Sequence, residues 1–257
     1  SDMPDAPVTL VILKVDGTLI RRFVGKKGSD DAAANQPERN MMAPGPEQIG
    51  RPDSIELQEG HNRFTWGLRY PDKTVASEDG EQYFGVGAGP MAVPGQYKVR
   101  LTVGDWTQTR DLNVQIDPRI KKDGVSKADL QAQLELNLKI RNALGKAQKM
   151  AAKMDTLRKR ITAAQESDEI AESKAKSLKA GLNKVYDQLV TSEEGSYPPP
   201  MWIDQTEYMY YMTISADQRP GNDAYTRFET LEKELEKIAA DWQEFRQNSD
   251  LPDSITD

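Results

Sequence analysis

The chain has 257 residues, of which 37% are hydrophobic and 29% are charged, and its formal net charge is −7. A chain of this length usually folds into two domains. The negative charge excludes nucleic acid as an expected partner, because phosphate binding requires a basic surface. No apolar run approaches the roughly 20 residues of a membrane-spanning helix. The absence of cysteine excludes disulfides and thiolate chemistry.

The first residues, SDMPDAP, have neither the basic nor the apolar region of a signal peptide. The opening SDM is typical of a cloning remnant, so we expect the sequence to be a fragment of a longer polypeptide. Part of the parent's chemistry would then lie upstream.

From Val8 to about Pro118 the sequence has the period of β-strands. Two β-rich runs flank Asp16-Gly17 in VTLVILKVDGTLIRRF, residues 8–23, and this dipeptide is typical of a tight hairpin turn. A polar insertion rich in Gly and Pro follows at 25–53 and has no usable period. We expect a long loop or a partly disordered segment there.

The stretch EGHNRFTWGLRYPD, residues 59–72, contains the single histidine of the chain. Its four largest apolar side chains occupy alternate positions, Phe64, Trp66, Leu68 and Tyr70. Alternation predicts a strand with these side chains on one face, ending at Pro71. Aromatic stacking on sugars is the alternative, but a position inside a sheet is favoured. A lone His61 without a second His or Cys does not make a zinc site, and we interpret it as structural or exposed.

Two further strands are predicted at the end of this half. Tyr97, Val99, Leu101 and Val103 are in step before a turn at Gly104-Asp105, and a last strand passes through Leu112, Val114 and Ile116. About seven short strands with turns between them predict an antiparallel β-sandwich over residues 1–118.

After Pro118 the period becomes helical, and we predict an elongated antiparallel helical bundle over 119–257. Ser126 to Asp129 has the pattern of a capping box. Narrow apolar seams at spacings of three and four residues, in the manner of coiled coils, predict a long helix hairpin over about 127–191 and a last helix over about 223–247. A Pro-rich crossing at 197–203 and a short helix at about 204–215 lie between them.

The stretch YPPPMWIDQTEYMYYM, residues 197–212, concentrates aromatic and methionine residues. Such residues close the end of a helical bundle, but they are also enriched at binding surfaces. Both interpretations stay open, and the candidate partner contacts are Trp202, Tyr208, Tyr210 and Tyr211.

Other candidate chemistry is weaker. Acidic pairs at Asp30-Asp31 and within 78–81 do not have the spacing of an EF-hand, so we predict no metal site. No phosphate-binding loop, nucleophile elbow or metalloprotease helix is present in the sequence, and we predict neither catalytic residues nor a cofactor. Exposed aromatics in the first half are the candidate glycan contacts: Tyr83, Phe84 and Trp106.

Three segments together, HNRFTWGLRYPD, GPMAVPGQYKVRLTVGDWTQTRDLNVQIDPR and PPPMWIDQTEYMYYMTISADQRPGNDAYTRFETLEKEL, carry a resemblance. The chain resembles, from Val8 to about Phe245, the C-terminal region of exported bacterial proteins with sortilin-like or BNR-repeat β-propellers, often labelled glycosyl hydrolases. The most specific matching positions are Asn62, Phe64, Trp66, Leu68, Arg69, Tyr70, Pro71, Pro94, Gly95, Tyr97, Asp117, Pro118, Arg119, Asp217, Arg219 and Pro220. Gly67 departs from the family, which often has Asp there. The first half also resembles an Ig-like or fibronectin type III-like domain.

The resemblance implies an exported protein in the periplasm or at the surface of a Gram-negative bacterium, with its hydrolase label resting on the upstream propeller. It supplies no catalytic residue for this chain. We therefore expect a non-catalytic accessory module that contacts the propeller of the same polypeptide and an envelope protein. The alternative is a carbohydrate-binding module that targets a glycosidase-like propeller to glycans.

Overall fold

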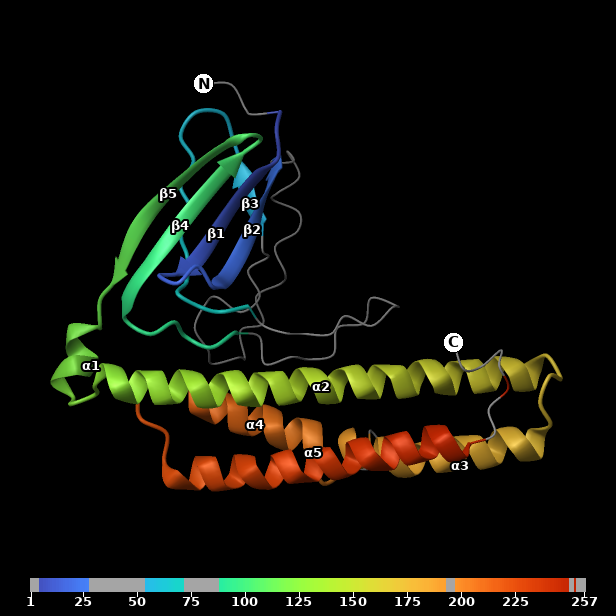
Figure 1. The fold of residues 1–257 in the computed structure, drawn as a ribbon. Coiled ribbons are helices and arrows are strands. Elements are labelled where there is room, and N and C mark those ends of the chain that lie inside the picture. The colour runs from blue at the N-terminus through green and yellow to red at the C-terminus, as the bar shows by residue number, and fades with distance from the viewer. Residues whose placement is uncertain (1–4, 28–53, 72–87, 193–196, 250–251, 253–257) are drawn as a thin grey trace. The chain divides into compact units, whose positions relative to one another are not determined.

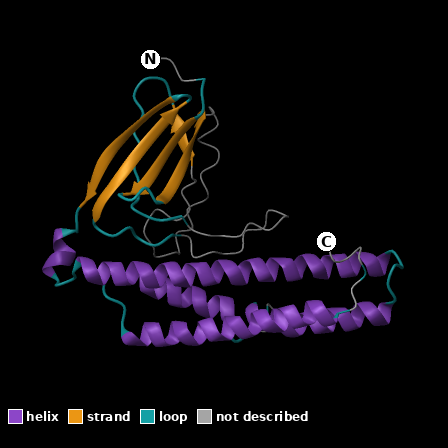
Figure 2. Ribbon diagram, in the orientation of Figure 1, coloured by secondary structure: helices purple, strands orange, loops and turns teal. Residues whose placement is uncertain are grey.

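The structure is a computed structural model, and it describes residues 5–27, 54–71, 88–192, 197–249 and 252. These residues form a mixed α and β structure with one five-stranded sheet and five helices (Figures 1 and 2). They divide into two compact units. Described residues up to Leu134 belong to the sheet unit, and those from Glu135 onward belong to the helical unit.

The sheet has the strand order β3-β2-β1-β4-β5. Its strands are β1 (Val8–Lys14), β2 (Leu19–Lys27), β3 (Ser54–Leu57), β4 (Gly95–Val103) and β5 (Trp106–Val114). Neighbouring strands are antiparallel except for β2 and β3, which are parallel. β3 and β5 are the two edge strands.

The hairpin predicted at 8–23 is confirmed as β1 and β2. Gly17 has φ of 88°, a conformation that glycine adopts without steric cost. The side chain of Asp16 accepts a hydrogen bond from the backbone N–H of Thr18 at 2.9 Å, which closes the turn. β2 continues to Lys27 and so includes the first residues of the segment predicted as a loop; residues 28–53 lie outside the described residues.

β4 and β5 present two different faces, as their register and the alternation of side chains show. One face is largely apolar and includes Tyr97, Val99, Leu101, Val103, Trp106 and Leu112. The other face is polar and includes Lys98, Arg100, Thr102, Thr107, Thr109 and Asp111. The hydrophobic core of the sheet unit includes Ile12, Phe23 and Tyr97.

The strand predicted at 63–70 is not formed, and this prediction was wrong. Within that segment, a single isolated bridge joins Arg69 to Met91. Leu68 has φ of 54°, which a strand does not allow, and the indole N–H of Trp66 donates to the carbonyl of Arg69 at 3.1 Å. The segment therefore bends at its end rather than extending a ladder.

The interpretation of this stretch as the inside of a sheet is supported by its ring contacts. The ring centre of Phe64 lies 4.6 Å from the ring centre of Phe23 on β2. The ring centre of Trp66 lies 5.7 Å from that of Tyr97 on β4. Tyr70 is buried, whereas His61 is exposed. The alternating side chains thus pack against the sheet, although their backbone does not pair with it.

The predicted sandwich of about seven strands is not what the described residues contain. They form one sheet of five strands, and the β2–β3 pair is parallel rather than antiparallel. A period of two in the sequence predicts which face of a strand each side chain occupies, but it does not predict which other strand pairs with that strand.

The helices are α1 (Pro118–Lys122), α2 (Lys127–Glu166), α3 (Glu172–Leu189), α4 (Trp202–Ile214) and α5 (Asn222–Asn248). The sequence placed the domain boundary at 118, the first residue of α1. The two compact units instead divide between Leu134 and Glu135, inside α2.

The capping box predicted at the start of α2 is formed. The backbone N–H of Asp129 donates to the hydroxyl of Ser126 at 3.2 Å, and the backbone N–H of Ser126 donates to the Asp129 carboxylate at 2.9 Å. Two backbone donors that the helix leaves unpaired are satisfied in this way.

In the helical unit, α4 and α3 lie along successive parts of α2 (Figure 1). The side chains of Asn137 and Gln148 on α2 bond to Thr213 and Glu207 of α4, at 3.4 and 3.2 Å. Farther along α2, Gln165 accepts a hydrogen bond from Lys179 of α3 at 3.1 Å. Arg158, which precedes Gln165 on α2, bonds to Asn183 of α3. For each helix the partner numbers fall as the α2 numbers rise, so α3 and α4 are both antiparallel to α2.

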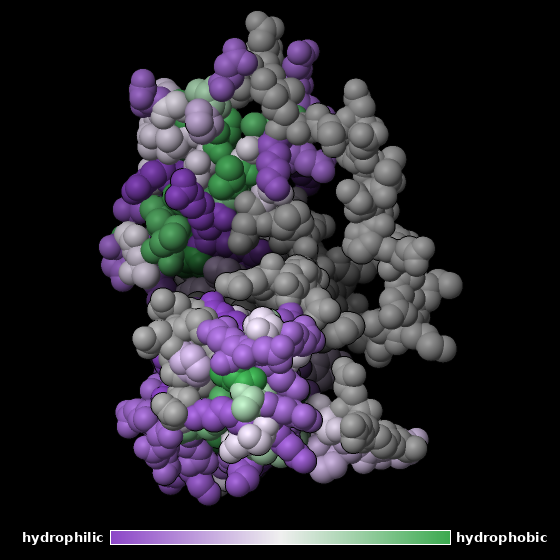
Figure 3. Space-filling model, turned by 90° about the vertical axis from the view of Figure 1, so that its right-hand side faces the viewer, coloured by the Kyte–Doolittle hydropathy of each residue, from purple (hydrophilic) through white to green (hydrophobic). Residues whose placement is uncertain are grey.

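α5 contacts both α3 and α4. The core shared by these helices includes Ile140, Met154, Ile161, Leu182, Leu189, Trp202, Tyr210, Leu231 and Trp242. Figure 3 shows one face of the molecule. On this face, hydrophilic residues cover most of the surface of the described residues, and hydrophobic residues form small separate areas. Among the described helices, none is long and apolar enough to cross a membrane.

Candidate interaction surfaces

α4 carries all four residues predicted as partner contacts, and its start is fixed by polar contacts. The backbone N–H of Met201 donates to the hydroxyl of Thr191 at 2.8 Å. The amide of Gln205 donates to the carbonyl of Pro200 at 2.6 Å. The first bond ties the residue before α4 to the segment that follows α3, and the second ties the first turn of α4 to the residues before it.

Two of the predicted contacts lie in the core. Trp202 is 3% exposed, and its indole N–H donates to the carbonyl of Leu231 on α5 at 2.8 Å. Tyr210 is 1% exposed. The structure therefore places both side chains where a partner does not reach them, in agreement with the packing interpretation of this stretch.

The other two contacts point to solvent. Tyr208 is 67% exposed and Tyr211 is 47% exposed, and Met212 beside them is 51% exposed. Their spacing of three and four residues places them on one side of the helix, and we call these three residues the α4 face. Met212 was not among the predicted contacts, although its spacing from Tyr208 is the signal that would have found it.

The α4 face offers two phenol rings and a thioether. Neither tyrosine hydroxyl forms a hydrogen bond within the described structure, so both remain available as donors and acceptors. Tyrosine and methionine are enriched at protein interfaces, because they bury large areas and adapt to the opposing surface. This arrangement suits recognition of another protein.

Of the three candidate glycan contacts, the structure describes one. Trp106 is the first residue of β5 and is 52% exposed, directly after the turn at Gly104-Asp105. Tyr83 and Phe84 lie outside the described residues, as do Asp30, Asp31 and the acidic segment at 78–81. No group of three or more metal-ligating side chains occurs among the residues that are described.

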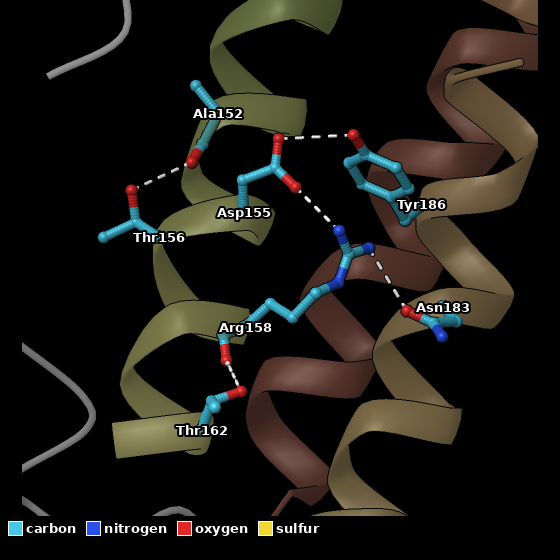
Figure 4. A network of polar contacts seen from close by, with 7 residues as sticks. All are labelled: Ala152, Asp155, Thr156, Arg158, Thr162, Asn183 and Tyr186. Atoms are coloured by element: carbon cyan, nitrogen blue, oxygen red, sulfur yellow. Dashed lines mark hydrogen bonds and ion pairs between the residues drawn. The ribbon is translucent and has the colours of Figure 1, made fainter. Parts of the chain in front are cut away.

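A polar network joins α2 to α3 (Figure 4). The carboxylate of Asp155 accepts hydrogen bonds from Arg158 at 2.8 Å and from the hydroxyl of Tyr186 at 3.2 Å. Arg158 also donates to the side chain of Asn183 at 3.2 Å, and its guanidinium lies 4.2 Å from the centre of the Tyr186 ring. Burial, followed by the charge of Asp155, raises the pKa of Tyr186. These polar side chains are hydrogen-bonded to one another, and their contacts hold α3 at a fixed position along α2.

A groove of about 570 Å³ lies between α3 and α5. Its apolar lining includes Leu178, Val185 and Phe245, and its rim carries charges of both signs, from Lys174 and Lys184 and from Asp241 and Glu244. A Cβ at Gly181 would come 2.9 Å from the ring of Phe245, so glycine is what allows this ring to lie against α3. The groove has room for an apolar side chain.

Comparison of the chain with protein-family models, with curated proteins and with solved structures gave no match.

Proposed function

We propose that the chain is a non-catalytic accessory module that binds another protein through the α4 face. The observation that carries the proposal is the exposure of Tyr208, Tyr211 and Met212 on a helix whose opposite side is fully packed. Exposed apolar residues grouped on one element mark an interaction site more often than residues scattered singly. A helix anchored by buried Trp202 and Tyr210 presents this face in a fixed position.

The test is capture of partners from a bacterial envelope fraction by the immobilised chain. The double variant Tyr208→Ala/Tyr211→Ala removes the rings of the α4 face without touching the core. We expect it to fold as the wild type does and to lose the captured protein. Trp106→Ala, which removes an exposed aromatic from the sheet unit, is the matched control and should retain capture.

Capture that survives in the Tyr208→Ala/Tyr211→Ala variant contradicts the proposal, and so does equal loss in Trp106→Ala. The first outcome would show that the partner binds elsewhere. The second would show that capture reflects exposed aromatic side chains in general.

The setting of the module is proposed from the resemblance described above. We infer that it follows a β-propeller in an exported polypeptide of the periplasm or cell surface, with a helical bundle as its second half. The propeller is then its neighbour within the same polypeptide, and any hydrolase activity belongs to the propeller. Expression of the module in trans with the separately produced propeller, followed by a binding measurement, tests that contact.

Carbohydrate binding is the second candidate, favoured by one observation. Trp106 presents an indole that is half exposed at the end of a hairpin, and sugar rings stack on such side chains. Titration with a panel of polysaccharides should give saturable binding in the wild type and none in Trp106→Ala. Flat titrations throughout would remove this candidate.

A further inference from the structure

The edge strand β5 is open along its length. It pairs with β4 on one side, and its residues from Trp106 to Asp111 are all exposed. Within the part of the chain that the structure describes, no backbone group of Thr107, Thr109 or Asp111 bonds to anything beyond β4. Such an edge is a template for another strand.

The hairpin geometry determines which backbone groups point outward. Val103 and Trp106 flank a two-residue turn and therefore form a hydrogen-bonded pair. Pairs alternate along the ladder, so the N–H and C=O groups of Thr107, Thr109, Asp111 and Asn113 point away from β4. The contact of 3.2 Å between the hydroxyls of Thr102 and Thr107 fits this assignment, because side chains approach more closely in pairs without backbone bonds.

β5 lacks two of the devices that usually protect an edge strand, proline and a β-bulge, although it carries Arg110 on the apolar face and Asp111 on the polar face. It contains neither proline nor lysine, and its register with β4 runs without a bulge from Trp106 to Val114. Natural sheets avoid long open edges of this kind unless the edge is used.

The sequence of β5 is complementary to itself in one antiparallel register. With Thr109 opposite Thr109 of a second copy, Trp106 faces Leu112 of the other copy and Thr107 faces Asp111. Gln108 then faces Arg110. Apolar groups meet on the apolar face, and a hydroxyl meets a carboxylate on the polar face.

Three neighbouring registers, with the axis at Gln108, Arg110 or Asp111, are disfavoured by charge. A two-fold axis at Arg110 places the two arginines opposite each other, and an axis at Asp111 does the same for the two carboxylates. An axis at Gln108 places Asp105 opposite Asp111 twice. Like charges directly opposite each other destabilise a pair of strands, so the register centred on Thr109 is preferred.

We propose that β5 pairs with β5 of a second copy of this chain about a two-fold axis at Thr109, which joins the two sheets into one. The pairing is isologous and closes at two chains. A two-fold axis perpendicular to the sheet keeps both apolar faces on the same side, so the exposed indole of Trp106 comes to lie beside Leu112 of the second copy. This surface is separate from the α4 face, and the proposal does not depend on the one above.

The absence of cysteine from the chain allows a direct test. In Thr109→Cys the two thiols would stand opposite each other, at a Cα separation of about 5.5 Å that a disulfide spans. In Thr107→Cys, the matched control, the two thiols would be offset by four residues, or roughly 13 Å along the strand. We expect mild oxidation to give a covalent dimer of Thr109→Cys and to leave Thr107→Cys monomeric.

The second test measures mass in solution. Sedimentation of the full chain should show a mass that rises with concentration from 28.8 kDa toward twice that value. Thr109→Pro removes an N–H that points outward, so it should leave the circular dichroism unchanged and abolish the dimer. Gln108→Pro removes an N–H that bonds to β4 and should lower stability instead.

Three results would overturn the proposal. One is a wild-type mass that stays monomeric at every concentration, together with no cross-linking of Thr109→Cys. Another is equal cross-linking of both cysteine variants, which would indicate random collision. The last is a dimer that persists in Thr109→Pro, which would place the interface on another surface.

Discussion

At the scale of the residue, neighbouring positions on α4 have opposite roles. Tyr210 is 1% exposed and Tyr211 is 47% exposed, although both are tyrosines at adjacent positions of the same stretch. Their difference follows from the helical period, which turns adjacent side chains by about 100°. A composition-based search selects both, and the register of the helix against its core separates them.

The first prediction compares two aromatic substitutions on α4. Trp202→Ala removes a buried side chain and its hydrogen bond to the Leu231 carbonyl, and it should lower the free energy of unfolding by about 3–5 kcal/mol. Tyr208→Ala removes an exposed ring and should change it by less than about 0.5 kcal/mol. Urea unfolding followed by circular dichroism measures both values. Equal effects would show that the register assigned to α4 is incorrect.

The second prediction concerns Tyr97 and pH. Burial, with a smaller contribution from Tyr70, raises the pKa of Tyr97 from 10.0 to about 12. The unfolded chain therefore loses this proton at lower pH than the folded chain does. The stabilisation is complete below pH 10 and disappears as the pH rises toward 12.

Tyr97→Phe should abolish this part of the pH dependence. Its free energy of unfolding should fall less steeply than that of the wild type as the pH rises above 10. Unfolding curves over that range measure the slopes, and identical slopes would contradict the assigned shift. The phenol also donates a hydrogen bond to the carbonyl of Val93, so a constant loss of about 1 kcal/mol is expected at neutral pH.

At the scale of the element, local signals in the sequence predicted what depends on local chemistry. The hairpin around Gly17 and the capping box at Ser126 were found from residue types alone. The last helix was predicted at 223–247 and runs over Asn222–Asn248. The strand predicted at 63–70 is not formed, and near its end Leu68 takes a left-handed conformation that no residue type in the stretch predicts.

Prediction of the candidate sites also succeeded where local sequence decides and failed where packing between distant segments decides. The sequence found the aromatic stretch that contains the α4 face, but it did not separate Trp202 from Tyr208, because burial depends on helices distant in sequence. The open edge of β5 was not predicted either. Strand order is set by pairing between distant segments, and a pattern within one strand carries no information about it.

The third prediction tests the start of α2. Ser126→Ala removes the acceptor for the Asp129 N–H and should lower the free energy of unfolding by about 1 kcal/mol. Ser177→Ala, at an exposed position inside α3, is the control and should be neutral or slightly stabilising, because alanine favours helix. Thermal unfolding compares them. An equal effect of the two substitutions would show that the cap contributes nothing.

At the scale of the whole molecule, each unit has a hydrophobic core of its own. Ile12 is 1% exposed in the sheet unit, and Leu182 is fully buried in the helical unit. A core of this kind supports folding of the surrounding residues as a cooperative group. The unit boundary inside α2 means that the first two turns of this helix are grouped with the sheet.

The fourth prediction uses one substitution in each core. Ile12→Ala and Leu182→Ala should each cost about 2–5 kcal/mol. Hydrogen exchange followed by mass spectrometry should show faster exchange in the sheet unit for the first and in α3 to α5 for the second. Uniform acceleration over the whole chain in both variants would instead indicate a single cooperative unit.

α3 ends at Leu189 and α4 begins at Trp202, and this break between the two helices determines where insertions and deletions can be accommodated. α3 and α4 each have their own set of contacts with α2, at Asp155 and Gln165 for α3 and at Asn137 and Gln148 for α4. An insertion within α3 would rotate every later residue of that helix by about 100° and bring charged side chains into the core. The same insertion between the two helices rotates neither. Homologues of different length are therefore expected to place their insertions and deletions there and to conserve the lengths of α3 and α4.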